Sequence, residues 1–352
     1  TDAYSASSPF LPRIQDKATP KGAVALASGS SSFDGSDDYI SGLGNCPTGN
    51  WTVSAWFKRN ATGSYHALYS ANTQIAIYVT SSDKIRVHYG GINDRKDSTA
   101  TIVSNQWYHV TATWDGTNAY LYINGSLEPF SATNGTPNNP TAEAGFLGRK
   151  SASGGDYFNG SMANVAIYSD AKTQSQIQDI MFSSYSTLTS ALKTNLVSWY
   201  DLGSTGLSSN KYNSTSGWTA YGNNTIQVNG LDFDITYVDN GNGIFGRYNN
   251  NILTSNVLAG AKYEVSFDAF YTGGSAPIVR YYTDAYTTIA TLTTESTNYK
   301  YIHTPVDSTN DFINFKTNSG NVVSVKNFSF KEIQATDSQG DNEGSIYGAT
   351  TN

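Results

Sequence analysis

Apolar and polar residues alternate with a period of two along several short segments in the first half of the chain. Trp51, Val53 and Phe57 fall on one side of an extended segment, and Thr52 and Ser54 fall on the other. The same alternation recurs in four further segments, which are residues 74–79, 84–89, 107–114 and 119–123. Asp-Gly and Asn-Gly pairs separate some of these segments, so the pattern predicts a β-sandwich or jelly roll.

Residues 173–181 carry the one helical pattern. Ile177, Ile180 and Met181 recur at helical spacing, and Thr173 can cap the first turn. We expect this short helix to close the first module. The Ser/Thr-rich residues 183–193 that follow are typical of a linker, with room for one more short turn.

Strand patterns resume after the linker in residues 263–270, 278–282, 287–293, 299–304, 312–316 and 322–333. A chain of 352 residues is too long for one sandwich of about 100–200 residues. The sequence therefore predicts an all-β protein with two β-sandwich (jelly-roll) domains and one short helix that closes the first. The last of these strands has an irregular alternation, which a β-bulge would explain.

Composition narrows the function classes. Charged residues make up only 14% of the chain and the net charge is −7, without a run of Lys or Arg, so we expect no nucleic-acid partner. No segment approaches the roughly 18 consecutive apolar residues of a membrane-spanning helix, so we expect no membrane insertion. Cys46 stands alone, which excludes an intrachain disulfide framework and leaves stability to packed cores or bound ions.

Four segments of the first module, taken in order, resemble the laminin-G-like, concanavalin-A-like lectin family: residues 32–40, 51–57, 106–110 with 120–125, and 158–168. Aromatic residues of these segments are expected to fill the space between two sheets, namely Phe33, Tyr39, Trp51 and Trp107. The family includes sugar-binding, protein-binding and structural members, so the resemblance alone assigns no ligand.

The second module resembles jelly-roll carbohydrate-binding modules through residues 258–269 and 325–332. That resemblance implies glycan binding on exposed aromatic residues and a structural calcium ion.

The opening of a laminin-G-like module, an apolar strand with Trp and then an Asp-Ser-rich turn, is not found at the start of the chain. Residues 196–202 and 337–350 resemble this opening instead. Either these segments fold back and complete the chain's own first module, or they begin the same module in a neighbour or in a removed continuation. The second arrangement predicts head-to-tail self-assembly by strand donation through residues 337–350.

The expected domain boundaries follow from these segments. Residues 1–190 form the laminin-G-like sandwich, and residues 191–209 are a linker or a strand that completes such a module. Residues 210–334 form the second jelly roll. Residues 335–352 are a tail that supplies a strand to the first module or to a neighbour.

Motifs of catalysis are missing from the sequence. The four histidines show no His-Glu-x-x-His spacing, there is no Gly-x-Ser-x-Gly elbow, and the closely spaced carboxylate motif of the sandwich glycosidases is absent from every strand predicted above. We therefore expect a protein that is not an enzyme, with no catalytic residues.

Sugar binding uses aromatic faces together with amide and carboxylate groups in a shallow cleft. Tyr281 and Tyr282 are adjacent, so they cannot both face the core of a regular strand. The candidates in the second module are Trp218, Tyr221, Tyr237, Tyr248, Tyr281, Tyr282 and Tyr286. Those on or near loops of the first module are Tyr65, Tyr89, Asn93, Asp94 and Tyr157. The alternative is that these tyrosines are rim or interface residues, where Tyr is also enriched.

Three carboxylates lie within five residues at Asp34, Asp37 and Asp38. Such an oxygen-rich loop is a candidate calcium site. The alternative, which we favour, is a solvated turn in which Asp side chains accept hydrogen bonds from their own backbone.

Paired lectin-like modules, few cysteines and a composition like that of phage fibre proteins favour a virion surface structural protein of a bacterial virus, either a capsid decoration or a fibre. Its partners would be a glycan or other virion proteins. The alternative is a secreted or cell-surface bacterial carbohydrate-binding protein, or a fragment of a larger adhesin or polysaccharide-processing enzyme.

Overall fold

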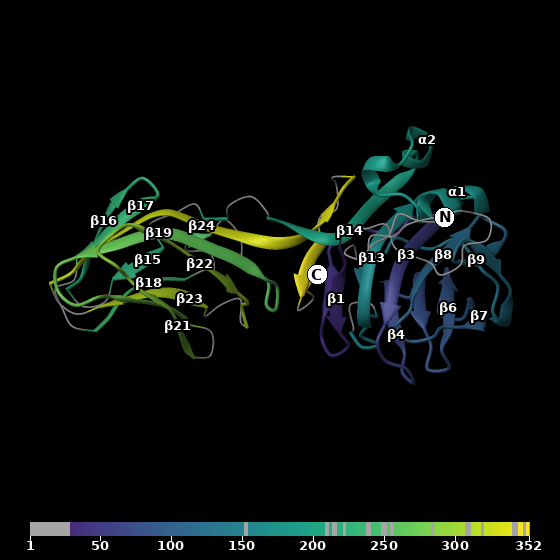
Figure 1. Cartoon of the computed structure of the whole chain (residues 1–352), viewed down its shortest axis with the longest axis horizontal. Helices are drawn as coiled ribbons and strands as arrows, with labels where there is room; N and C mark the ends of the chain where they lie inside the picture. Colours follow the sequence, from purple (N-terminus) through teal and green to yellow (C-terminus); the bar gives the residue numbers. More distant parts are fainter. Residues whose placement is uncertain are drawn as a thin grey trace, which may run out of the picture. The chain divides into compact units, whose positions relative to one another are not determined.

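The computed structural model describes residues 29–150, 154–207, 211–212, 217–220, 223–236, 241–247, 252–253, 257–282, 285–306, 311–317, 320–339, 344–347 and 350–351. They form two compact units (Figure 1). The first unit runs to Gly206 and resumes at Gln334, and the second unit is Leu207–Ile333. The second unit is therefore inserted into the first. Almost every element is a strand, which confirms the predicted all-β fold.

Two antiparallel sheets form the first unit. The sheet around β3, here the β3 sheet, has the order β10 (Ser126–Glu128), β9 (Ala119–Ile123), β8 (Trp107–Trp114), β3 (Trp51–Arg59) and β13 (Asn159–Tyr168). One half of β13 then pairs with β1 (Ser31–Asp34), and the other half pairs with β14 (Leu196–Leu207). Asn124 and Gly125 both have positive φ, 52° and 74°, as the predicted turn between β9 and β10 requires.

The second sheet of this unit, here the β5 sheet, contains β11 (Phe130–Asn134), β7 (Arg95–Thr101), β6 (Lys84–Tyr89), β5 (Ile75–Val79), β4 (His66–Ala71), β12 (Phe146–Leu147) and β2 (Tyr39–Ser41) in spatial order. The two sheets face each other across an apolar core. Trp51 of β3 stacks on Tyr89 of β6, with 5.3 Å between ring centroids.

Of the four aromatic residues expected between the sheets, Phe33 and Trp51 are buried there, but Tyr39 and Trp107 are not. Ile40 takes the inward position of its short strand, so Tyr39 points outward and stacks on Tyr347. Trp107 is paired with the outward-facing Lys58 and packs on the outer side of the β3 sheet. The prediction for these two residues was wrong because alternation turns them away from the core.

Helix α1 (Gln174–Met181) confirms the predicted helix. Thr173 and Gln176 form a capping box, and the three apolar residues Ile177, Ile180 and Met181 are buried. The helix covers the outer face of the β3 sheet, where Trp56 Nε1 donates to the carbonyl of Met181 at 3.1 Å. None of the described helices is long and apolar enough to span a membrane.

The Ser/Thr-rich segment after α1 is packed against the first unit, which the linker interpretation did not anticipate. It contains the 3-10 helix η1 (Tyr185–Thr187) and α2 (Ser190–Lys193). Leu188 and Leu192 are buried in a cluster with Trp199 of β14. Two apolar residues in a polar run are therefore enough to fix this segment on the sheet.

The C-terminal strands complete both sheets of the first unit. The end of β24 (Val322–Asp337) pairs with β25 (Gly344–Tyr347), which pairs with β2, and β26 (Thr350–Thr351) pairs with β1 (Figure 1). Asp337 Oδ1 accepts a hydrogen bond from the backbone N–H of Trp199 at 2.8 Å. The chain thus takes the folded-back arrangement. The prediction of head-to-tail self-assembly through residues 337–350 was therefore wrong. The chain's own strands pair with the edges of β1 and β2 that a neighbour would need.

The second unit is also a sandwich. One sheet has the order β15 (Trp218–Ala220), β18 (Gly241–Arg247), β23 (Phe312–Thr317), β20 (Ile278–Tyr282) and β21 (Tyr286–Thr291). The other has β16 (Thr225–Asn229), β17 (Asp232–Thr236), β24, β19 (Tyr263–Thr272) and β22 (Thr297–His303). The expected bulge in the last strand is present: Asn327 has φ 53° where the register of β19 and β24 shifts.

Candidate functional site

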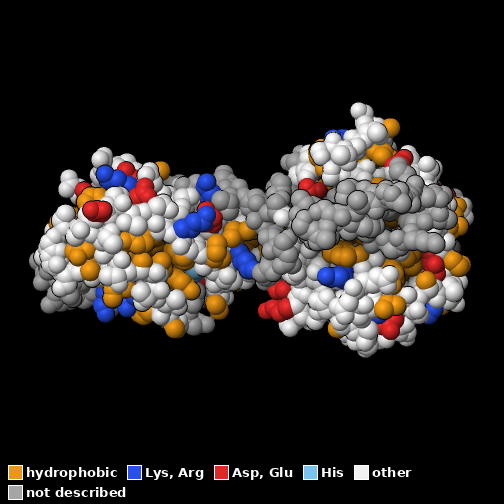
Figure 2. All heavy atoms as spheres, in the orientation of Figure 1, with side chains coloured by type: hydrophobic (Ala, Val, Ile, Leu, Met, Phe, Trp, Pro, Cys, Tyr) orange, Lys and Arg blue, Asp and Glu red, His pale blue; other side chains and the backbone are white. Residues whose placement is uncertain are grey.

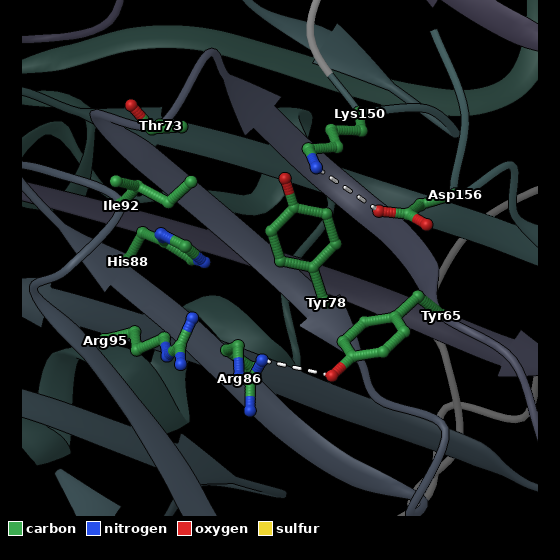
Figure 3. A pocket seen from close by; sticks show the side chains of 9 residues that line it. All are labelled: Tyr65, Thr73, Tyr78, Arg86, His88, Ile92, Arg95, Lys150 and Asp156. Carbon is green, nitrogen blue, oxygen red and sulfur yellow. Dashed lines mark hydrogen bonds and ion pairs between the residues drawn. The ribbon is translucent and has the colours of Figure 1, made fainter. Parts of the chain in front are cut away.

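A hollow of about 310 Å³ lies on the face of the β5 sheet that points away from the core. Strands β5 and β6 create it by alternation: Ile77 and Val87 point into the core, whereas Tyr78 and Arg86, paired on adjacent strands, point outward. Nine residues line the hollow, which are Tyr65, Thr73, Tyr78, Arg86, His88, Ile92, Arg95, Lys150 and Asp156 (Figure 3).

Tyr78 lies at the centre of the hollow (Figure 3). It packs on the small side chains of Ala67 and Ala76, which leave room above the sheet. The ring meets that of His88 edge to face, with 5.6 Å between centroids. Burial raises the pKa of the Tyr78 phenol, so its hydroxyl stays neutral and can both donate and accept a hydrogen bond.

His88 is a neutral side chain in this hollow at neutral pH. Burial lowers the pKa of His88 to about 4, and the nearby Arg86, Arg95 and Lys150 act in the same direction. Nδ1 lies 3.3 Å from the carbonyl oxygen of Gly91, which can only accept, so Nδ1 carries the proton. The Nε2 atom is then an acceptor for a ligand hydroxyl.

Arg86 is held rigidly beside Tyr65. Asp97 accepts two hydrogen bonds from the guanidinium, at 2.7 and 2.8 Å, and this pairing raises the pKa of Arg86. Nη1 donates to the hydroxyl of Tyr65 at 3.1 Å, and Tyr65 remains 37% exposed. The ring of Tyr65 is therefore an oriented, solvent-accessible aromatic face at the edge of the hollow.

Acid is expected to destabilise the first unit through His88. The folded-state pKa of about 4 lies below the ~6.5 of an unfolded histidine, so the unfolded chain binds more protons once the pH falls below about 6.5. Stability from the neutral ring is complete above that pH and is lost progressively as the pH falls toward 4. We expect the free energy of unfolding, measured by urea denaturation, to fall between about pH 7.5 and about pH 4.5 by about 2–3 kcal/mol more in the wild type than in His88→Gln. Equal losses in the two proteins would contradict a neutral, buried His88.

Residues 34–178, which include every residue that lines the hollow, match the family model described as the concanavalin A-like lectin/glucanases superfamily. This segment of the chain is therefore similar to concanavalin A-like lectin domains. It makes up most of the first unit, called the lectin-like unit from here on. No curated protein sequence matches the chain.

Solved structures similar to the chain include a proposed carbohydrate-binding protein from Bacteroides ovatus, with 19% identity and a TM-score of 0.43 over 55% of this chain and 57% of that one. The chain therefore spans little more than half of that protein. A heptameric SAP-like pentraxin from Limulus polyphemus has 18% identity and a TM-score of 0.37 over 44% of this chain and 81% of that one.

Domain 4 of an extracellular arabinanase from Geobacillus stearothermophilus, solved with arabinotriose, has 23% identity and a TM-score of 0.35 over 43% of this chain and 76% of that domain. Identities and TM-scores at these levels transfer no ligand and no residue role to the chain.

Of the loop residues of the lectin-like unit that were predicted to bind sugar, only some lie at the hollow. Tyr65 lines it, whereas Asn93 and Asp94 lie in the β6–β7 loop beside the lining residue Ile92. The carboxylate of Asp94 accepts from Asn138 Nδ2 at 2.7 Å, which stabilises this loop. Tyr157 is half-buried and follows Asp156 without lining the hollow.

The prediction that Tyr89 binds sugar was wrong. The side chain of Tyr89 is fully buried against Trp51, and its hydroxyl donates to the carbonyl of Tyr120 at 2.8 Å. Alternation with the outward-facing His88 turns it into the core. The outward positions of the predicted strand patterns could have identified three of the lining residues that were missed, namely Tyr78, Arg86 and His88, whereas Arg95 lies on β7, which those patterns did not include.

The prediction that Trp218 of the second unit binds sugar was also wrong. Trp218 is 6% exposed, packs against Phe233, and donates from Nε1 to the hydroxyl of Tyr212 at 3.3 Å, so it has no free face for a sugar. Tyr281 is half-buried and stacks on Tyr301 at 5.5 Å. Three other candidates lie outside the described residues, namely Tyr221, Tyr237 and Tyr248.

Two predicted tyrosines of the second unit meet in an aromatic platform. Tyr282 and Tyr286 are paired across β20 and β21, with ring centroids 5.0 Å apart, and Tyr282 also stacks on Phe312. The guanidinium of Arg280 lies 3.6 Å from the ring of Tyr286, which is 46% exposed. Glycan binding on this platform stays a prediction.

Ligand atoms of Asp34, Asp37 and Asp38 lie within 4.8 Å of one another, which is donor chemistry that suits calcium. Asp34 Oδ1 accepts from the backbone N–H of Ser36 at 2.7 Å, and Asp38 Oδ2 accepts from that of Asp34 at 2.8 Å. These bonds are those of the self-bonded turn. The same oxygens thus already accept hydrogen bonds from the backbone of the turn, and calcium binding stays a prediction.

Proposed function

We propose that the lectin-like unit binds a glycan in the hollow of the β5 sheet and does so without catalysis. The observation that carries the proposal is the oriented Tyr65 ring beside a concave floor of hydrogen-bonding groups, the combination by which proteins hold sugars. Asp156 is the one carboxylate among the nine described lining residues. The carboxylate pair of a glycosidase thus has no counterpart in this lining, which supports a binding role.

Replacing Tyr65 should weaken this binding. Tyr65→Ala removes the exposed ring and the hydrogen bond to Arg86, so we expect about tenfold weaker affinity for the best oligosaccharide found on a glycan array. Tyr65→Phe keeps the ring and should lose less. Isothermal titration calorimetry on the full chain gives both values.

Val103→Ala is the matched control, because Val103 is 60% exposed and does not line the hollow. Its affinity should equal that of the wild type. If Tyr65→Ala binds every array glycan with the affinity of the wild type, the sugar binds elsewhere and the proposed site is refuted.

We further propose that this binding serves on a virion surface, as a capsid decoration or fibre of a bacterial virus. The low charge, the single cysteine and the pairing of two sandwich units support this setting. The second candidate is a secreted or cell-surface bacterial carbohydrate-binding protein. Immunogold labelling of particles and of cells separates the two: label on particles supports the first, and label confined to the cell envelope supports the second.

A further inference from the structure

Three cationic side chains converge on the hollow, although the chain carries a net charge of −7. They are Arg86, Arg95 and Lys150. On the face drawn in Figure 2, the Lys and Arg side chains of the described residues form separate small patches. The hollow thus gathers three cations in a chain whose net charge is negative.

Two of these cations have carboxylate partners. Arg86 is paired with Asp97 through two hydrogen bonds, and Lys150 Nζ lies 4.0 Å from Asp156 Oδ2. Arg95 makes no ion pair with any residue that the structure describes. Since His88 is neutral, the lining keeps an uncompensated positive charge at Arg95.

The position of Arg95 suits a ligand group. It lies on β7 in register with His88 of β6, and Figure 3 shows it across the ring of Tyr78 from Lys150 and Asp156. Arg95 also borders a smaller hollow of about 130 Å³ on the side of β11. Its guanidinium therefore borders open space on two sides, where a planar anion can approach it.

We propose that the hollow selects a sugar that carries a carboxylate, with the carboxylate on the guanidinium of Arg95 and the sugar ring against Tyr65. This proposal rests on glycan binding at the same site. A guanidinium matches a carboxylate with two parallel hydrogen bonds, and half-buried surroundings screen the attraction less than water does. Asp156, on the opposite side of the hollow, is placed to accept from hydroxyls of the ring.

Matched pairs of probes test the charge directly. Trigalacturonate is compared with its methyl ester, and sialyllactose with lactose, by calorimetry on the full chain at low salt. A carboxylate on Arg95 should give at least about tenfold tighter binding of the acidic member of one pair. Arg95→Gln should abolish that difference, because it weakens binding of the acidic member much more than binding of the neutral member. Arg95→Lys keeps the charge without the planar fork and should retain part of the preference.

The other outcomes separate two failures. Equal affinity for the acidic and neutral members overturns the acidic preference and leaves glycan binding standing, whereas binding of no glycan on the array refutes the proposed function itself. A preference that survives Arg95→Gln overturns the role of Arg95. Sulfated lactose that binds as tightly as the carboxylated probe overturns the choice of a carboxylate over a sulfate ester.

Discussion

Truncation after Ile333 is expected to unfold the lectin-like unit or to lower its free energy of unfolding by several kcal/mol, while the second unit keeps its own transition. The deletion removes Ile346, which is 3% exposed, and Asp337, which bonds the backbone of Trp199. It also leaves the edges of β1 and β2 unpaired. Differential scanning calorimetry of the full and truncated chains measures both transitions.

The point variant Ile346→Ala is the milder version, and it should cost about 2–4 kcal/mol in the lectin-like unit alone. Light scattering adds a test of assembly, since the full chain should be a monomer in solution. Two results would contradict this account: an unfolding transition of the lectin-like unit that truncation leaves unchanged, or multimers that dissociate when the tail is removed. Either would show that the tail does not complete the lectin-like unit of its own chain.

Trp51→Ala is expected to destabilise the lectin-like unit by about 3–5 kcal/mol. The side chain is fully buried between the sheets and stacks on Tyr89, the neighbour of the lining residue His88. The cavity left behind should therefore also loosen the hollow and weaken glycan binding. Urea denaturation measures the stability, and calorimetry with the best array glycan measures the binding.

Trp51→Phe is the matched control for this variant. Trp51 Nε1 is buried without a hydrogen-bond partner among the described residues, so removing it loses no bond. The phenyl ring keeps most of the packing, and the cost should stay below about 1.5 kcal/mol. Similar losses for Trp51→Ala and Trp51→Phe would contradict the cavity argument.

The sequence predicted the fold well because its signals were local. Alternation placed the strands, and the Thr173 cap with Ile177, Ile180 and Met181 placed the helix within its observed bounds. The folded-back tail was left as one of two arrangements. Pairing of residues 344–347 with 39–41 joins segments some 300 residues apart, and local patterns do not specify such a pairing.

The candidate site was predicted less well, for a physical reason. The candidates predicted from the sequence include Tyr65, which lines the hollow, and the two residues that follow Ile92, but they also include Tyr89 and Trp218, which pack in cores. The residues that shape the hollow are the outward positions of the central strands β5 and β6. Whether such a position faces open solvent or lines a concavity depends on the small side chains of Ala67 and Ala76 beside it, and on Lys150 and Asp156 from another part of the chain.

A crystal structure of the full chain with its best array oligosaccharide tests glycan binding in the hollow most directly. We predict a sugar ring against Tyr65 and over Tyr78, with a carboxylate oxygen within hydrogen-bonding distance of Arg95. A sugar bound instead on the platform of Tyr282 and Tyr286, with the hollow left to solvent, would contradict the assignment of the lectin-like unit as the binding unit.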